Sequence, residues 1–247
     1  MPLISGAIAE PAIAACLFSL VFLLGKYVHP LRSFIPDRRV IISFCAGMSV
    51  AYVFVRVMPE LQGARHAFKE NVASAQHFEG IIVYFTALIG FLVFYGLENQ
   101  SRRLQQTSHS DQSGPAFRLD VGGFSAYVLL MSYLLVNNIE ETSYSLLLYA
   151  VAIALHFLAV DHGLRREHGT AYDRYGRFVL AGMAILGWII GLLLPLPPYA
   201  IALIVAFTSG GIIVNSMLEE LSHDKDGRFV PFLFGSLLYG GILVPFG

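Results

Sequence analysis

Charged residues are scarce in this chain. Of its 247 residues, 13% are charged and 56% are hydrophobic, whereas a soluble domain usually carries about 25% charged residues. The formal net charge is -1, and without a basic surplus we expect no nucleic-acid partner. The mean hydropathy of +0.65 therefore indicates an integral membrane protein.

Cysteines and enzyme motifs are equally sparse. Cys16 and Cys45 both fall inside apolar segments, where they are typical small core residues, so no disulfide framework can be inferred. The chain has no glycine-rich phosphate loop, nucleophile elbow or dinucleotide fingerprint, and we therefore expect no enzyme. No cation precedes the first apolar run and Lys26 follows it, so the start does not resemble a cleaved signal.

Long apolar runs dominate what is present. Each has close to the 17 to 25 residues that a helix needs to cross about 30 Å of hydrocarbon, and such continuous runs exclude an alternating β-barrel. We predict an all-α membrane protein with one transmembrane domain, 1–247, and a mobile cytoplasmic link at about 99–120. Glu10-Pro11, Met58-Pro59 and the proline-rich 195–198 are predicted to end helices. The eight predicted spans are 11–28, 40–58, 80–97, 122–139, 144–161, 178–196, 199–218 and 229–245.

The cations give the chain an orientation. By the positive-inside rule, the links richest in Lys and Arg lie in the cytoplasm. The links after the odd-numbered spans hold 13 of the 16 cations, and the opposite links hold only Arg65 and Lys69, with Arg56 near the end of the second span. Both termini are therefore predicted outside. The 13 are Lys26, Arg32, Arg38, Arg39, Arg102, Arg103, Arg118, Arg165, Arg166, Arg174, Arg177, Lys225 and Arg228.

A short motif occurs in two of the spans. Phe44-Cys45-Ala46-Gly47 lies in the second span and Phe207-Thr208-Ser209-Gly210 in the seventh, and these spans cross the membrane in opposite directions. This predicts an inverted repeat of spans 1–3 in spans 6–8 around spans 4–5, a common arrangement in secondary transporters. The alternative is that the motif only provides close packing. Pairs of small residues four apart, which favour close packing of membrane helices, occur at Gly187 and Gly191 and at Ser236 and Gly240.

Polar groups at several depths predict an ion pathway, because each is costly in hydrocarbon. Asn137 and Glu141, four residues apart, share a helix face, and His156 lies about 21 Å along the next span. Carboxylate, amide and imidazole ligands suit Zn²⁺, Mn²⁺ or Fe²⁺. The alternatives are that the acids end helices in water and that His156 bonds a neighbouring helix. The predicted metal site comprises Asn137, Asn138, Glu141, His156, Asp161, Asn215 and Glu219.

Two stretches resemble a known family. Ser43–Gly47 with Met58-Pro59-Glu60, and Ala206–Gly211 with Leu218-Glu219-Glu220, are similar to helices two and seven of the ZIP family of divalent-metal transporters. The resemblance implies a bundle with helices four and five at its centre, carrying the metal site. It also implies transport of Zn²⁺, Fe²⁺ or Mn²⁺ toward the cytoplasm, with Zn²⁺ as the foremost substrate. We expect the ion and the lipid bilayer as partners, and a homodimer as the assembly to test.

The resemblance also assigns residues. The family's pattern His-Asn-x-Pro-Glu falls on 137–141, so that Asn138 and Glu141 match while the His and Pro positions differ. His156 matches the leading His of the fifth helix, but the acid expected four residues later is Val160, and Asp161 follows it. Asn138, Glu141 and His156 would hold the ion. Asp161, Asn215 and Glu219 would pass it inward.

Two other functions remain open at this point. One is an intramembrane zinc hydrolase, which needs three ligands and an open position for activated water. His156, Asp161, His162 and His168 are its candidates, although no HExxH spacing occurs. The other is a ZIP-like metal sensor or scaffold without transport. A simpler interpretation of Asp161 is an i,i+4 ion pair with Arg165 at a helix end.

Overall fold

The computed structural model describes residues 2–27, 38–71, 79–107, 114–137, 143–221 and 228–244, and within these ranges no strand occurs. Several of the helices are long and apolar enough to cross a membrane, which confirms the prediction of an all-α membrane protein. Five stretches meet that condition: Ala9–Tyr27, Ile81–Gln105, Pro115–Asn137, His156–Leu193 and Pro198–Asn215.

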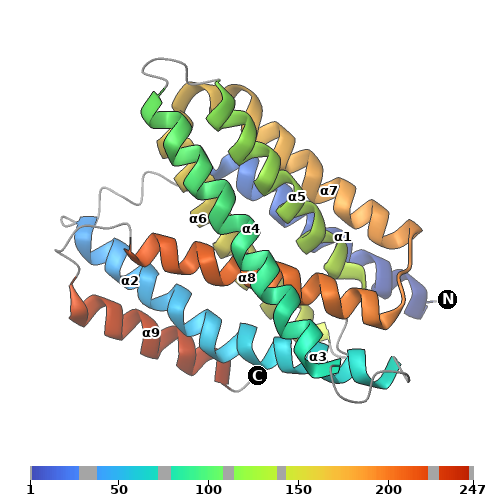
Figure 1. Cartoon of the computed structure of the whole chain (residues 1–247). Helices are drawn as coiled ribbons and strands as arrows, with labels where there is room; N and C mark the ends of the chain where they lie inside the picture. Colours follow the sequence, from blue (N-terminus) through green and yellow to red (C-terminus); the bar gives the residue numbers. More distant parts are fainter. Residues whose placement is uncertain are drawn as a thin grey trace. The chain divides into compact units, whose positions relative to one another are not determined.

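Every predicted span coincides with a helix over its described residues (Figure 1), except that the sixth ends early, because 194–196 is non-helical. The fifth and sixth predicted spans belong to one nearly continuous helical run, and the eighth forms a shorter apolar helix. The helices are α1 (Pro2–Leu24), α2 (Arg38–Tyr52), α3 (Met58–Asn71), α4 (Glu79–Thr107), α5 (Pro115–Asn137), α6 (Ser143–Ala171), α7 (Arg177–Leu193), α8 (Pro198–Leu221) and α9 (Phe229–Leu243).

Two of the three predicted helix ends are wrong. Pro11 lies inside α1, where a membrane helix tolerates proline because neighbouring groups satisfy the freed carbonyl. The helical run also continues through Pro59 into α3. A π-helical turn, Val53–Val57, directly precedes this proline, and the Met58 N–H bonds Val53 O, so the wider turn relieves the usual proline clash. The third prediction is confirmed, because 194–197 is non-helical between α7 and α8.

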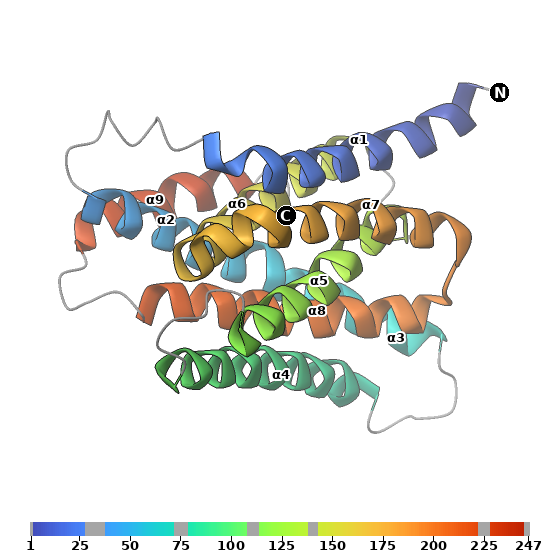
Figure 2. The same ribbon diagram turned by 90° about the horizontal axis from the view of Figure 1, so that it is seen from above.

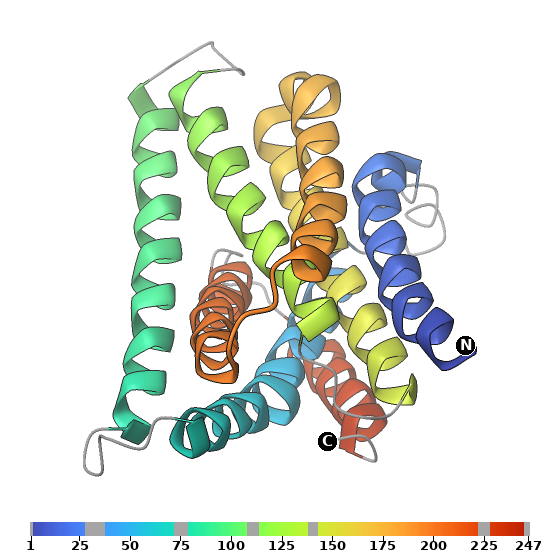
Figure 3. The same ribbon diagram turned by 90° about the vertical axis from the view of Figure 1, so that its right-hand side faces the viewer.

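The chain divides into two compact units. The first comprises Met1–His29 and Gly96–Leu196 and therefore contains α1, α5, α6, α7 and the end of α4. Figure 3 shows its four longer helices packed together. Its core is aromatic, with the Phe18 ring 5.0 Å from that of Phe157 and both fully buried. Gly187 and Gly191 contact the α5 backbone, which confirms this small-residue pair as a packing site.

The second unit comprises Pro30–Tyr95 and Pro197–Gly247. Its helices α2 and α9 lie side by side (Figure 2). A Cβ on Gly47 would overlap the Phe232 carbonyl, and one on Gly235 would overlap the Phe44 carbonyl. The Ser236 hydroxyl donates to Gly47 O at 3.0 Å. The predicted packing role is therefore confirmed for Gly47 and Ser236, whereas the close approach on α9 is at Gly235 and not at Gly240, where a Cβ would make only ordinary contacts.

The predicted link at about 99–120 is largely helical. α4 continues to Thr107 and α5 begins at Pro115, while 108–113 lies outside the described residues. Gln, Leu and Arg in the sequence after residue 99 are good helix formers, so α4 extends beyond its apolar part. The end of α4 and the start of α5 thus contribute polar side chains to the first unit.

Candidate functional site

The predicted metal residues fall in different parts of the structure. Asn138 and Glu141 lie outside the described residues, and Glu219 belongs to α8, where only its backbone is described. Asn215 is in the second unit, and its buried side-chain nitrogen has no hydrogen-bond partner among the described atoms. The other three predicted residues, Asn137, His156 and Asp161, belong to the first unit.

Asn137 ties two helices together at the end of α5. Its side-chain nitrogen donates to Tyr133 O at 3.3 Å on its own helix and to Gly191 O at 3.2 Å on α7. Both contacts use the amide nitrogen, and a cation would be bound by the amide oxygen. The arrangement therefore fixes the orientation of this side chain and does not use the amide oxygen, which is the atom that would bind a cation.

His156 lies against two aromatic side chains of the first unit. Its Nε2 shares a hydrogen bond of 3.0 Å with the hydroxyl of Tyr127 on α5. The two rings meet edge to face at 5.7 Å, and Phe157 packs against the same tyrosine. This is the interhelical bond expected in the structural interpretation of His156. An ion bound at Nε2 would have to replace it, whereas Nδ1 offers a second ligand atom.

Asp161 is the centre of a buried ion-pair network. It is 1% exposed, and both of its carboxylate oxygens accept hydrogen bonds of 2.9 Å from Arg165. The hydroxyl of Tyr172 donates to one oxygen at 2.8 Å, and Arg165 also pairs with Asp173. The predicted i,i+4 ion pair is therefore confirmed. Both bonds come from the same arginine nitrogen, Nη2. A carboxylate paired with an arginine is already neutralised, and it attracts a cation less strongly than a free one.

The backbone at the end of α1 packs closely against this network. A Cβ on Gly25, directly after α1, would overlap the Asp161 carboxylate, so the close approach requires glycine at this position. Gly176 lies equally close to the ring of Tyr172, across the π-helical turn Tyr172–Gly176. Gly25 thus brings the end of α1 against the Asp161 carboxylate of α6, and Gly176 leaves room for the Tyr172 ring that donates to that carboxylate.

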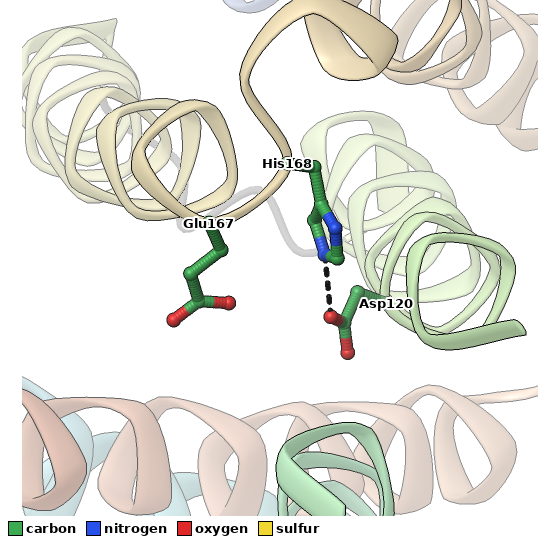
Figure 4. Close-up of side chains that lie close together, drawn as sticks. All are labelled: Asp120, Glu167 and His168. Carbon is green, nitrogen blue, oxygen red and sulfur yellow. Dashed lines mark hydrogen bonds and ion pairs between the residues drawn. The ribbon is translucent and has the colours of Figure 1, made fainter. Parts of the chain in front are cut away.

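A second cluster of ionisable groups lies at the start of α5. Asp120 and His168 are 5% and 3% exposed, and the His168 Nε2 donates to Asp120 Oδ2 at 2.7 Å (Figure 4). Ser101, on α4, donates to the same oxygen at 2.5 Å. Glu167 is exposed, and one ligand atom each of Asp120, Glu167 and His168 lies within 4.8 Å of the others. Within the described part of the chain, this is the only such group of acids and imidazoles.

A break in the α6 helix shapes this cluster. Gly169 has φ 48° and ψ -118°, a backbone conformation that glycine adopts and other residues avoid. In an unbroken helix, consecutive side chains point in different directions. Figure 4 shows Glu167 and His168 leaving the chain next to the break, with both side chains directed toward the side where Asp120 lies.

Sequence reasoning missed two of these three residues. His168 is predicted only as a ligand of the alternative hydrolase, and Asp120 and Glu167 are not among the predicted residues. Asp120 lies two residues before the fourth predicted span, and the Glu167-His168-Gly169 tripeptide joins two ligand types to a helix-breaking residue. That combination was the available signal. The pairing of Asp120 with His168 spans 48 positions and could not be read from local spacing.

Comparison with known proteins adds no relative. No model of a protein family matches the chain, and neither does any curated protein or solved structure.

Proposed function

We propose that this protein is a ZIP-like carrier that moves a divalent cation, foremost Zn²⁺, across the membrane toward the cytoplasm. The observation that carries the proposal is a series of hydrogen-bonded polar side chains along α5. Asn137, Tyr127 and Asp120 bond in turn to α7, to His156 and to His168. Polar groups inside membrane helices are costly, and such series are typical of ion and proton pathways.

The series extends over most of a membrane's thickness. At 1.5 Å per residue, Asn137 lies about 15 Å from Tyr127 along α5, and Tyr127 lies about 10 Å from Asp120. Together they cover about 26 Å, close to the roughly 30 Å of the hydrocarbon core. Asp120 and Tyr127 are two helical turns apart and share a face. Asn137, ten residues beyond Tyr127, is turned by about 80° from that face. A cation that followed the series would therefore also pass between two faces of α5.

The finer topology is part of the proposal. We propose that all eight helical runs predicted from the sequence cross the membrane, with both termini outside and the ends of α4 and α6 at the cytoplasmic face. The cation bias of the links supports this orientation. Asp120 and His168 would then lie at the inner end of the pathway, where an imported ion leaves.

Two matching helix crossings in the second unit support the inverted repeat. In one, Phe44 and Gly47 of α2 cross α9, with each glycine against the other helix's carbonyl. In the other, Phe207 and Gly210 of α8 cross α4 in the same manner, with Gly210 against Ala87 O and Gly90 against Phe207 O. A repeat that relates spans 1–3 to spans 6–8 exchanges α2 with α8 and α4 with α9, and therefore relates these two crossings.

Metal accumulation in cells tests the proposal. Cells that lack their own high-affinity zinc uptake would express the wild-type protein, His156→Ala or His66→Ala, and their Zn, Mn and Fe contents would be measured. His66 is an exposed imidazole on α3, so its substitution is the matched control. We expect zinc accumulation with the wild type and the control, and a loss of at least tenfold with His156→Ala.

Two results would count against the carrier. One is a zinc content equal to that of cells with an empty vector, although the protein reaches the membrane. The other is full accumulation with His156→Ala, which would remove this imidazole from the pathway.

A further inference from the structure

We infer that Asp120, Glu167 and His168 form a binding site for a divalent transition-metal ion, Zn²⁺ or Mn²⁺, at the junction of α4, α5 and α6. None of the seven residues predicted as ligands belongs to it. The site does not require that the protein be a carrier, because a sensor could use it equally well.

The ligand atoms are close enough for one ion. Zn²⁺ binds imidazole nitrogen and carboxylate oxygen at about 2.0–2.2 Å, so two ligands of one ion are separated by up to about 4 Å. The three ligand atoms lie within 4.8 Å of one another, and an ion would replace the proton that His168 Nε2 donates to Asp120 Oδ2 over 2.7 Å. Small rotations of the exposed Glu167 side chain are therefore enough to complete the set. Two oxygens and one nitrogen suit Zn²⁺, Mn²⁺ or Fe²⁺ better than a thiolate-seeking metal.

The backbone has an unusual conformation next to two of these ligands. Glu167 and His168 are consecutive, and the positive φ of Gly169 interrupts the helix immediately after them. The segment is otherwise helical on both sides of this residue. Unusual backbone of this kind is often associated with functional sites. A purely structural tie between α5 and α6 would need His168 alone, whereas Figure 4 also shows the Glu167 carboxylate on the same side of the chain as His168, next to the Asp120–His168 pair.

The groups around the site hold the Asp120 carboxylate in place and add a second negative charge beside it. Ser101 donates to Asp120 Oδ2, as the outer partners of metal ligands commonly do. Glu167 adds a second carboxylate, with an oxygen within 4.8 Å of the Asp120 ligand atom. A divalent cation would relieve the repulsion between the carboxylates of Asp120 and Glu167.

Metal binding by the purified full-length protein tests the site. The protein in detergent would be stripped with a chelator and titrated with Zn²⁺, and with Co²⁺ as a spectroscopic probe for imidazole and carboxylate ligation. We expect Asp120→Asn, Glu167→Gln and His168→Ala each to weaken binding by at least tenfold. The matched controls are His66→Ala and Glu70→Gln, an exposed imidazole and an exposed carboxylate on α3, and both should bind as the wild type does.

Glu167→Gln keeps the inference falsifiable if the buried variants fail to fold. Glu167 is exposed, and glutamine preserves its shape, so this variant should elute as the wild type in size exclusion. His156→Ala distinguishes this site from the His156 position of the proposed pathway, because it should leave the Co²⁺ bands of the site in place. A wild type that binds no Zn²⁺, or a folded Glu167→Gln that binds it unchanged, would overturn the inference. A wild type that binds Zn²⁺ at this site yet transports none would instead count against the carrier alone.

Discussion

Replacing Gly235 by alanine tests the α2–α9 crossing. The added Cβ would overlap the carbonyl oxygen of Phe44, which belongs to the backbone of α2 and cannot move aside as a flexible side chain could. The two helices would have to separate locally. Gly241 lies six residues further along α9, and a Cβ added there would meet no atom within 4 Å, so Gly241→Ala is the matched control on the same helix.

The control isolates the energy of the overlap. Both substitutions gain about 1 kcal/mol of helix propensity, so this contribution cancels in their difference. Overpacking a close contact costs about 1–3 kcal/mol, and we expect Gly235→Ala to be less stable than Gly241→Ala by this amount. At this chain length, each kcal/mol corresponds to roughly 2–4 °C in Tm. Thermal unfolding of the purified variants in one detergent would measure the difference.

The inverted repeat extends this prediction to α4. Gly90 meets the Phe207 carbonyl of α8, whereas a Cβ on Gly96 would meet no atom within 4 Å. If the two crossings are equivalent, Gly90→Ala and Gly235→Ala should lower Tm by similar amounts relative to their controls. Equal stability of Gly235→Ala and Gly241→Ala would refute the close backbone contact, and a loss at only one crossing would refute the equivalence.

Three further predictions concern bonds and topology. Tyr133→Phe removes a hydroxyl that donates to Leu194 O and accepts from Leu196 N, and it should lower the unfolding free energy by about 1–3 kcal/mol; an unchanged Tm would contradict this. Asp161→Asn breaks the buried pair with Arg165 and should lower the unfolding free energy by about 3–5 kcal/mol. Glu98→Gln breaks a more exposed pair with Arg102 and should lower it by at most about 1 kcal/mol. Equal losses in the two variants would contradict this difference between buried and exposed pairs. In a cysteine-free background, a cysteine at position 109 should react with reagents from the cytoplasmic side and one at position 66 from outside, and the reverse labelling would refute the orientation.

The apolar runs predicted where helices occur, because length and hydropathy are local properties of the sequence. They did not predict where each helix stops. The helix through Pro59 depends on a π-helical turn, and the long α4 depends on helix propensity beyond its apolar part. Proline and polarity usually indicate helix ends, and both are overridden here by backbone adjustments within the helix.

The site was less accessible to sequence reasoning. Small-residue spacing correctly indicated close packing at Gly187 and Gly191, and the spacing of Asp161 and Arg165 correctly indicated an ion pair. The bond between Asp120 and His168 depends instead on how α5 packs against the broken end of α6. Such long-range proximity follows from tertiary packing, which no periodicity in a single sequence encodes.

Zinc flux through the purified protein is the most direct test of the carrier. Wild-type protein would be reconstituted into liposomes that contain a zinc-sensitive dye, and external Zn²⁺ would be added with protein-free liposomes as the control. We expect a saturable rise of the dye signal that depends on the protein and that His156→Ala reduces at least tenfold. A protein that binds Zn²⁺ in detergent yet produces no more signal than protein-free liposomes would contradict the carrier and indicate a metal sensor.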